Sequence, residues 1–139
     1  MFRGVGNQYG FDWRLLAAQA KQESRFDYRA VSKAHAVGLM QILPGTGAEI
    51  ARELKLSAWS LYDPLTAIQM GGYYDSKMRS GTRTRSDSYL SNLRLMLCAY
   101  NAGLGNVRKY GTCPPFPETQ TYWKGIFSYW DTYKLKESP

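Results

Sequence analysis

The stretch LLAAQAKQESRF, residues 15–26, is the part of the sequence from which we predict the fold. At about 100° of rotation per residue, the apolar residues in and just before it share one face of a helix. They are Trp13, Leu16, Ala17 and Ala20. Glu23 follows Leu16 by seven residues and falls at the edge of this face. The pattern predicts a helix that carries a carboxyl group to the rim of a hydrophobic core.

A carboxyl group at the rim of a core loses hydration, which disfavours its charged form and raises its pKa. A carboxylic acid with a raised pKa keeps its proton near neutral pH and can donate it during catalysis. Most glutamates on helices are instead solvated or paired with a cation, so the position of Glu23 alone does not identify a catalytic group. Other parts of the sequence decide between these two interpretations.

Length and composition predict one globular domain over residues 1–139. The chain is 44% hydrophobic and 21% charged, and it is too short for two ordinary domains. We expect no membrane span, because no apolar run approaches the ~20 residues that cross a bilayer. Residues 1–6 also lack the apolar core of a signal peptide. We therefore expect either an excised or processed domain, or a protein that reaches its target without such a signal.

The net charge of +7 favours contact with an anionic partner such as nucleic acid, a phosphate-bearing wall polymer or a membrane surface. A solvated basic face explains the charge equally well. The densest basic cluster is Arg79, Arg83 and Arg85, in and beside a predicted loop over residues 80–86.

The two cysteines, Cys98 and Cys113, leave two interpretations open. They could pair in an oxidising compartment. However, Cys98 lies in an apolar run of a predicted helix and Cys113 lies beside two prolines. Buried free thiols are the simpler interpretation, and we favour it at this point.

Periodicity and capping residues predict an all-α fold. Asp12 is a suitable N-cap for a helix over residues 13–24, whereas residues 26–37 lack periodicity and are expected to form a loop. Further helices are predicted over residues 47–54, 64–78, 89–100, 105–110 and 118–133. The sequence has no convincing alternating strand pattern and no internal repeat.

Local motifs set some of these boundaries. Thr46 and Glu49 have the spacing of a capping box, and Asp63 precedes a proline that suits the first position of a helix. Ser86, Asp87 and Ser88 are the predicted caps of the helix that follows. Each glycine of the Gly71-Gly72 pair costs about 1 kcal/mol relative to alanine inside a helix. The pair therefore indicates close helix packing or a bend.

Four segments can be read together: ES at 23–24, GLMQ at 38–41, AYNAG at 99–103 and PETQTY at 117–122. In this order and at these separations they resemble the soluble-type (family 1) lytic transglycosylases. The resemblance runs from about residue 9 to residue 126. It implies an α-helical, lysozyme-like fold with a saccharide-binding cleft, and a peptidoglycan lytic transglycosylase activity.

Carried over position by position, the resemblance makes Glu23 the catalytic acid and base. Ser32 matches the active-site serine that the family has nine residues downstream of its acid. Gln41 matches an amide that binds saccharide. Taken alone, Ser32 would be an ordinary loop hydroxyl and Gln41 an ordinary core residue.

The later motifs supply three further substrate-binding candidates. Tyr100 and Asn101 match an aromatic wall and a polar contact beside the acid, and Glu118 matches a carboxylate that contacts substrate or shapes the site. His35 departs from the family pattern, which usually has glycine before Ala36. If the backbone there needs a positive φ, histidine is strained where glycine would not be. His35 is the only histidine in the sequence, and we interpret it as a loop residue near the cleft and not as a catalytic group.

The resemblance implies that Glu23 protonates the oxygen of a MurNAc-GlcNAc β-1,4 bond while the N-acetyl group of the substrate assists. Glu23 then takes a proton from the C6 hydroxyl, which leaves a 1,6-anhydro-MurNAc end and consumes no water. Glycoside cleavage commonly uses two carboxylates, and here the motif supplies one evident acid. We expect no cofactor and no metal, because the sequence offers no convincing cluster of metal ligands.

Three other functions stay open. They are a lysozyme-type hydrolase in which water attacks, a saccharide-binding module without turnover, and a basic nucleic-acid-binding domain. The partner we expect is the glycan strand of peptidoglycan, with anionic wall polymers as a further candidate and no nucleic acid. We expect a monomer in the periplasm or cell envelope, or one carried by a phage virion or a secretion system.

Overall fold

The computed structural model describes residues 1–83 and 88–136, and nearly all of its regular structure is helical. In chain order the helices are α1 (Phe2–Tyr9), α2 (Trp13–Ser24), α3 (Pro44–Glu53), α4 (Pro64–Thr82), α5 (Tyr89–Ala102), α6 (Leu104–Tyr110) and α7 (Pro117–Lys136). Within these residues the only β features are two isolated bridges, from Val37 to Val31 and to Ile42. The predicted all-α class is confirmed.

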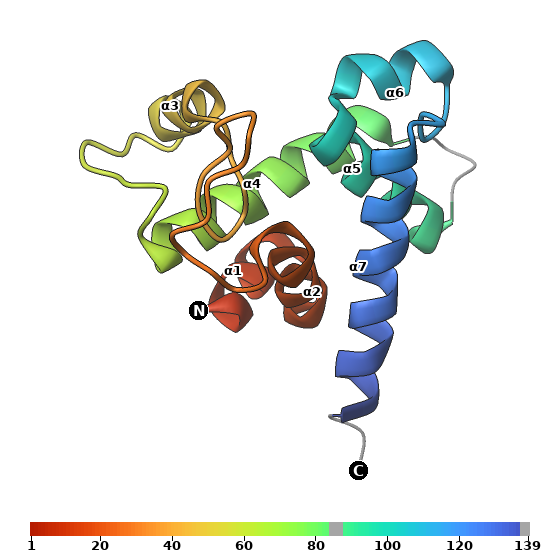
Figure 1. The fold of residues 1–139 in the computed structure, drawn as a ribbon, viewed down its shortest axis with the longest axis horizontal. Helices are drawn as coiled ribbons and strands as arrows, with labels where there is room; N and C mark the ends of the chain where they lie inside the picture. The colour runs from red at the N-terminus through yellow and green to blue at the C-terminus, as the bar shows by residue number, and fades with distance from the viewer. Residues whose placement is uncertain (84–87, 137–139) are drawn as a thin grey trace.

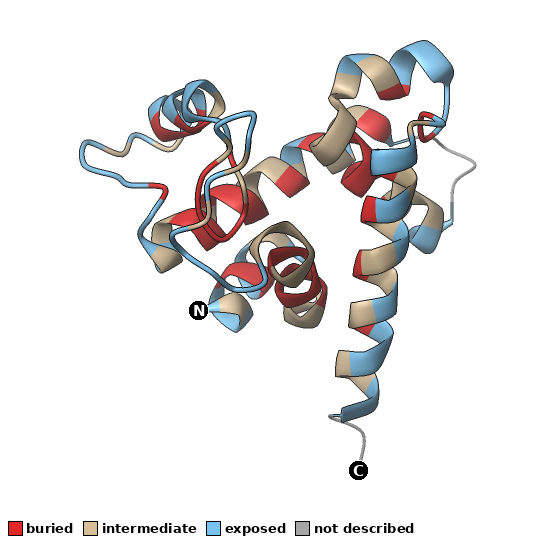
Figure 2. Ribbon diagram, in the orientation of Figure 1, coloured by how far each residue is buried: buried red, intermediate tan, exposed pale blue. Residues whose placement is uncertain are grey.

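Helix α2 lies at the centre of the molecule, between α1 and α7 (Figure 1). Helix α4 crosses behind it and packs against α1, α3, α5 and α6. The long loop over residues 25–43 lies on one side of the molecule beside α3, and α6 lies on the other (Figure 1). Buried residues line the inner sides of α2, α4 and α5 and one face of α7 (Figure 2). The ends of α2 and α5 therefore meet the long loop at one place.

The predicted bounds of α2 are confirmed, and its capping explains them. The carboxylate of Asp12 accepts a hydrogen bond from the backbone N–H of Arg14 at 3.0 Å, and Arg25 ends the helix in the left-handed region at φ 55°. The six consecutive residues 15–20 are all buried, so the middle of α2 has protein on every side. Glu23, in the last turn, is half-buried. It lies where the helix leaves the core.

The Gly71-Gly72 pair allows close packing, one of the two outcomes that the sequence indicated. A Cβ atom on Gly71 would lie 2.7 Å from the Cε atom of Met40, and one on Gly72 would lie 3.2 Å from the ring of Tyr9. The two glycines thus let α4 approach both α1 and the GLMQ segment. This contact sets the position of residues 38–41.

Some boundaries differ from the prediction. Helix α1 was not predicted, because glycines at positions 4 and 6 lower its intrinsic propensity, and its formation depends on packing against α2 and α4. Helix α3 begins at Pro44, and its N-cap Leu43 makes no side-chain cap bond. The predicted capping box is therefore wrong, and Glu49 instead pairs with Lys77 at 3.6 Å.

The loop predicted over residues 80–86 is partly wrong, because α4 continues to Thr82. Arg85 of the basic cluster and the expected caps Ser86 and Asp87 lie outside the described residues. The third expected cap, Ser88, does cap α5, since its side chain accepts a hydrogen bond from Ser91 N at 3.2 Å. At the end of the chain, α7 extends three residues beyond its predicted end, to Lys136.

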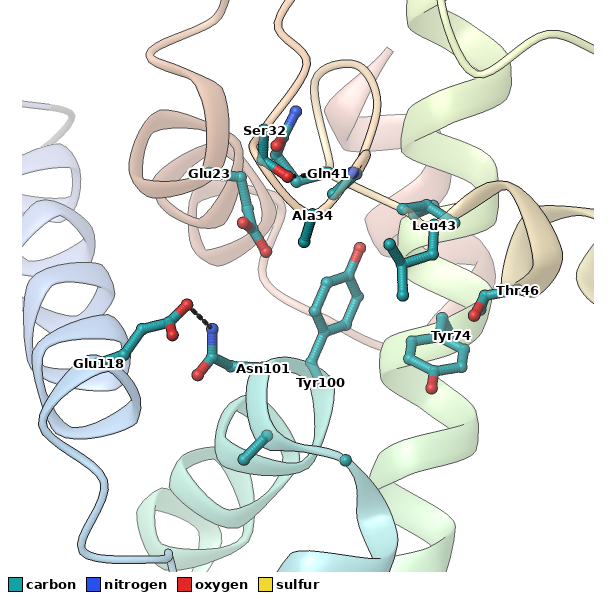
Figure 3. A pocket seen from close by; sticks show the side chains of 14 residues that line it. Glu23, Ser32, Ala34, Gln41, Leu43, Thr46, Tyr74, Tyr100, Asn101 and Glu118 are labelled. Carbon is teal, nitrogen blue, oxygen red and sulfur yellow. Dashed lines mark hydrogen bonds between the residues drawn. The ribbon is translucent and has the colours of Figure 1, made fainter.

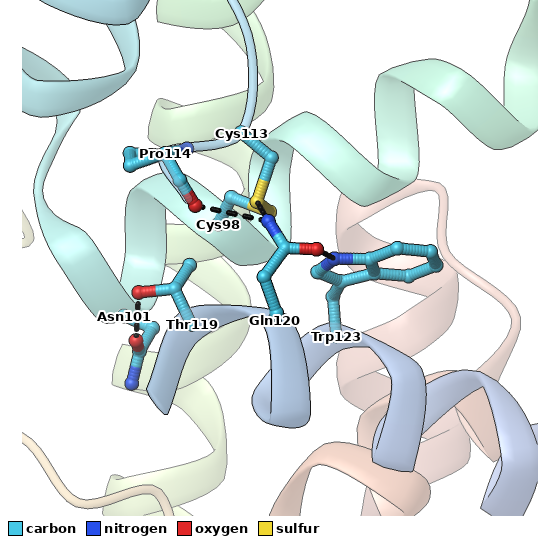
Figure 4. The surroundings of a disulfide bond; sticks show 7 residues. All are labelled: Cys98, Asn101, Cys113, Pro114, Thr119, Gln120 and Trp123. Atoms are coloured by element: carbon cyan, nitrogen blue, oxygen red, sulfur yellow. Dashed lines mark hydrogen bonds between the residues drawn. A yellow bond between two sulfur atoms is a disulfide. The ribbon is translucent and has the colours of Figure 1, made fainter. Parts of the chain in front are cut away.

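The favoured interpretation of the cysteines is also wrong, because Cys98 and Cys113 form a disulfide (Figure 4). Their Cα atoms are 5.5 Å apart although the residues are separated by 15 positions. The turn at α6 brings the chain back to α5, and this return was not evident from the two cysteines alone. Gln120 supports the same corner, since its amide donates to Pro114 O at 2.9 Å. The disulfide ties α5 to the segment that leads from α6 into α7.

We expect reduction of this disulfide to lower the free energy of unfolding by ~3 kcal/mol, because it closes a loop of about 15 residues. In a domain of this size that corresponds to a fall in Tm of about 10 °C. Thermal unfolding with and without a reductant measures the effect. The Cys98→Ala/Cys113→Ala variant is the control, and its Tm should not respond to the reductant. An equal response in both proteins would contradict the prediction.

Candidate functional site

A cleft of about 420 Å³ lies where α2, α5 and the long loop meet. Its lining includes all the site residues predicted from the sequence: Glu23, Ser32, Gln41, Tyr100, Asn101 and Glu118. Figure 3 shows them coming from α2, the loop, α5 and α7 around one space. A second hollow of about 480 Å³ adjoins it along α7, and Glu23 and Asn101 line both. The cleft therefore extends to both sides of Glu23.

The Glu23 carboxyl group has the properties of a proton donor at neutral pH. Its pKa is raised from 4.5 to about 8, mainly by burial and to a smaller extent by the negative charge of Glu118. The Tyr122 hydroxyl opposes this shift, since it donates a hydrogen bond of 2.7 Å to Oε2 of Glu23 and so favours the carboxylate. Glu23 is thus protonated at neutral pH and has a donor ready for its ionised form.

Tyr122 is a site residue that the sequence analysis missed. It is the last residue of the fourth motif, but the motif was used without giving this tyrosine a role. Its ring stacks on Tyr100 at a centroid distance of 6.5 Å and an interplanar angle of 14°. The signal available in the sequence was its spacing, because Tyr122 follows Glu118 by four residues on the same face of α7.

Tyr100 forms part of the cleft wall and also holds the GLMQ segment. Its hydroxyl donates to Met40 O at 2.8 Å, and its ring meets that of Tyr74 edge to face at 5.2 Å. Ser24 holds the same segment from the other side, since its hydroxyl donates to Leu39 O at 2.9 Å. Residues 39 and 40 are thus tied directly to α2 and α5.

Gln41 and Ser32 both hold the loop in shape. The Gln41 amide nitrogen donates to Gly38 O at 2.9 Å and to Ala30 O at 3.1 Å, which uses both of its hydrogens. A saccharide would therefore meet the amide oxygen of Gln41. The Ser32 hydroxyl oxygen accepts a hydrogen bond from Ala36 N at 3.0 Å.

His35 lies on the same loop and has a φ of 69°, so the backbone condition considered in the sequence analysis holds. Its side chain is exposed, and its neighbours Ala34 and Ala36 line the cleft. A histidine at this φ carries a strain that glycine would not.

Asn101 and Glu118 connect α5 with α7. The Asn101 amide nitrogen donates a long hydrogen bond of 3.5 Å to Glu118 Oε1 (Figure 3). The Asn101 Oδ1 atom accepts a hydrogen bond from the Thr119 hydroxyl at 2.8 Å (Figure 4). Glu118 is exposed in the first turn of α7. The Cys98–Cys113 disulfide lies immediately beside this connection, so it supports the side of the cleft that carries Glu118 (Figure 4).

A buried polar cluster behind Glu23 was also missed. Gln19 of α2 and Asp75 of α4 are both completely buried, and the Gln19 amide donates to Asp75 Oδ1 at 3.1 Å and to Tyr122 Oη at 3.0 Å. Burial raises the pKa of Asp75 well above its usual value, and the charge of Glu23 raises it further. This cluster had one signal in the sequence. Its residues are polar but occupy helix positions that the periodicity predicts to be buried.

The described residues contain no group of three or more His, Cys, Asp or Glu side chains that could hold a metal ion. No helix among them is long and apolar enough to cross a membrane.

Comparison with known proteins is consistent with this geometry. The chain resembles the membrane-bound lytic murein transglycosylase F of Alcanivorax borkumensis, with 35% identity over 107 residues. The match covers 77% of this chain and 21% of that protein.

The fold resembles an inactive glutamate-to-glutamine mutant of the lytic transglycosylase Slt from Pseudomonas aeruginosa. The TM-score is 0.83, with 30% identity, over 97% of this chain and 23% of that one. It also resembles the 70-kDa soluble lytic transglycosylase in complex with bulgecin A, with a TM-score of 0.84 and 28% identity, over 99% of this chain and 24% of that one.

The chain spans between a fifth and a quarter of the length of these relatives. The expected lysozyme-like fold is confirmed by the likeness to the solved structures. The family model described as Transglycosylase SLT domain matches residues 1–122, which is most of the chain. The chain therefore belongs to the SLT-domain transglycosylase family.

Proposed function

We propose that residues 1–139 form a single catalytic domain that cleaves the MurNAc-GlcNAc β-1,4 bonds of peptidoglycan and leaves 1,6-anhydro-MurNAc ends. The observation that carries this proposal is the half-buried carboxyl group of Glu23, whose pKa is about 8, in a cleft that the motifs of the family surround. The relatives are lytic transglycosylases, which supports the reaction class.

In the first step, Glu23 donates its proton to the glycosidic oxygen, and the bond from that oxygen to C1 of MurNAc breaks. The carbonyl oxygen of the 2-acetamido group bonds to C1 from the opposite face and compensates the positive charge that develops there. Glu23 is left as a carboxylate, which accepts the 2.7 Å hydrogen bond from Tyr122. This bond stabilises the ionised form at the stage that needs it.

In the second step, the Glu23 carboxylate takes the proton of the C6 hydroxyl. The C6 oxygen bonds to C1 and displaces the acetamido oxygen, which restores the N-acetyl group. Glu23 is again a carboxylic acid, and the products together contain the atoms of the substrate without added water. One residue with a pKa near 8 can serve as acid and then as base, because both of its states are accessible close to neutral pH.

The other cleft residues would hold the glycan. Tyr100 offers a ring face to a sugar, and Gln41 offers an amide oxygen to an N–H or O–H group. We propose that Ser32 and Asn101 supply further polar contacts at the two sides of Glu23. Glu118 would act on Glu23 through its charge as well as by contact with substrate.

A lysozyme-type hydrolase remains the second candidate, because Glu118 places another carboxylate at the same cleft. Hydrolysis needs a carboxylate that activates water or attacks C1, and Glu118 is the group that could do so. The two reactions differ in their products, since only the transglycosylase leaves anhydro ends.

We propose that the domain works as a monomer at the cell envelope or in the periplasm, where its substrate lies. The Cys98–Cys113 disulfide supports an oxidising compartment. The net charge of +7 would favour contact with anionic wall polymers as well as glycan strands. Delivery by a virion or a secretion system would bring the domain to the same substrate.

We expect Glu23→Gln to lower the cleavage rate by about 10²–10⁴, because the amide keeps the shape of the side chain and cannot transfer the proton. Mass spectrometry of digested peptidoglycan measures both the rate and the presence of anhydro ends. Glu49→Gln, which changes an exposed glutamate paired with Lys77, is the matched control and should cleave as the parent does. Near-parental turnover in Glu23→Gln would refute the assignment.

The pH dependence should follow the Glu23 acid. Because the active form is protonated, kcat/KM should fall about tenfold per pH unit as pH rises above about 8. Glu118→Gln removes a negative charge that raises the pKa of Glu23, so this fall should begin at lower pH. Rates measured across pH with both proteins test the sign. A fall that begins at higher pH in Glu118→Gln would contradict the electrostatic argument.

A further inference from the structure

A chain of hydrogen bonds runs from the buried carboxyl group of Asp75 to Glu23. The Gln19 amide nitrogen donates to Asp75 Oδ1 at 3.1 Å and to Tyr122 Oη at 3.0 Å. The Tyr122 hydroxyl in turn donates to Glu23 Oε2 at 2.7 Å. Three helices, α2, α4 and α7, supply the groups, and the two at the start of the chain have no exposed surface.

The Gln19 amide gives this chain a direction. A tyrosine hydroxyl has one hydrogen, which can rotate toward whichever neighbour accepts it. Since Tyr122 Oη accepts a hydrogen bond from Gln19, its hydrogen is directed to Glu23. Without the amide, the hydroxyl would lose the neighbour that fixes this orientation.

The same cluster contains two buried oxygens without a hydrogen-bond partner, Gln19 Oε1 and Asp75 Oδ2. They belong to two groups already joined by one hydrogen bond. An ionised Asp75 would be a buried charge with a single donor, which is costly. One proton on Asp75 Oδ2 removes the charge and supplies a donor to Gln19 Oε1. An amide and a carboxylic acid can then form two hydrogen bonds to each other.

The charged and titratable groups around Asp75 also favour its neutral form. Glu23 faces it from α2, and Tyr100 and Tyr122 face it from α5 and α7. Arg79, the cation on the same helix, directs its guanidinium to Tyr9 O at 3.3 Å and lies over the ring of Phe11. Burial raises the pKa of Asp75 well above its usual value, although the positive charge of Arg79 acts to lower it.

We propose that Gln19 and Asp75 form a neutral amide–carboxylic acid pair that holds the Tyr122 hydroxyl as a donor to Glu23. Both are then positioning residues for Glu23. Their role in the reaction rests on the proposed function, whereas the neutral state of Asp75 does not.

The stability of Asp75→Asn tests the neutral state without any measurement of activity. An unfolded Asp is ionised above about pH 4, so between pH 5 and 7 unfolding of the parent releases a proton from Asp75 in addition to the proton from Glu23. Both proteins therefore lose stability as pH rises, and the variant lacks only the part of this dependence that comes from Asp75. We expect the ratio of their folding equilibrium constants to move tenfold per pH unit in favour of Asp75→Asn.

Denaturant unfolding at several pH values between 5 and 7 measures this ratio. Asp63→Asn is the matched control, because hydrogen bonds from the backbone N–H and the hydroxyl of Thr66 lower the pKa of Asp63 in the folded protein, so its ratio should stay constant over this range. A constant ratio for Asp75→Asn would overturn the proposal. Failure of Asp75→Asn to fold would also overturn it, since the amide is the isostere of the neutral acid.

The positioning role is tested by the pKa of Glu23, measured by carboxyl carbon NMR in the parent, Gln19→Met, Tyr122→Phe and the double variant. Gln19→Met removes the donor to Tyr122, so the pKa of Glu23 should rise, and Tyr122→Phe should raise it as well. The double variant should show no further rise beyond Tyr122→Phe. An unchanged pKa in Gln19→Met, or additive shifts, would overturn the positioning role.

The alkaline fall of kcat/KM should move to higher pH in Gln19→Met together with the NMR value. If Gln19→Met does not fold, Gln19→Met/Asp75→Val removes both polar groups and allows the same comparison. Cleavage by Glu23→Gln would refute the proposed function and leave these two measurements intact. The two failures are therefore distinguishable.

Discussion

The hydrogen bond from Tyr122 to Glu23 joins the two helices on which the site depends. It is 2.7 Å long and links the last turn of α2 to α7, which pack directly against each other. Glu23 can be half-buried and still accessible because α2 leaves the core at this turn. A shift of either helix would change the hydration of the carboxyl group and its donor together, so the chemistry of the site follows from helix packing.

Several other features keep these elements in register. The Gly71-Gly72 pair lets α4 approach Met40, and the Tyr100 hydroxyl then holds Met40 O from α5. On the opposite side, the Cys98–Cys113 disulfide holds the segment before α7 against α5, and Thr119 in the first turn of α7 bonds to Asn101. The two sides of the cleft are therefore held by different means, one by close packing and the other by a covalent bond.

The sequence predicted the parts of this arrangement that local patterns record. Glu23 stood out because it lies at the edge of an apolar helix face, and motif spacing located Tyr100 and Asn101. The disulfide, helix α1 and the start of α3 were missed, because each depends on contacts between distant segments or on packing that outweighs intrinsic propensity. Gln19 and Asp75 were missed for a related reason, since a buried polar pair is visible only when both partners are seen together.

Two opposing effects on Glu23 explain why the buried cluster is compatible with a reaction that uses one residue twice. Burial favours the carboxylic acid, which is needed to protonate the leaving oxygen, and the Tyr122 hydrogen bond favours the carboxylate, which is needed to take the second proton. With burial alone, the carboxylate would be a costly intermediate. With a stronger set of donors, the acid would lose its proton below neutral pH. A single directed hydrogen bond at a buried carboxyl group keeps both forms close in free energy near neutral pH.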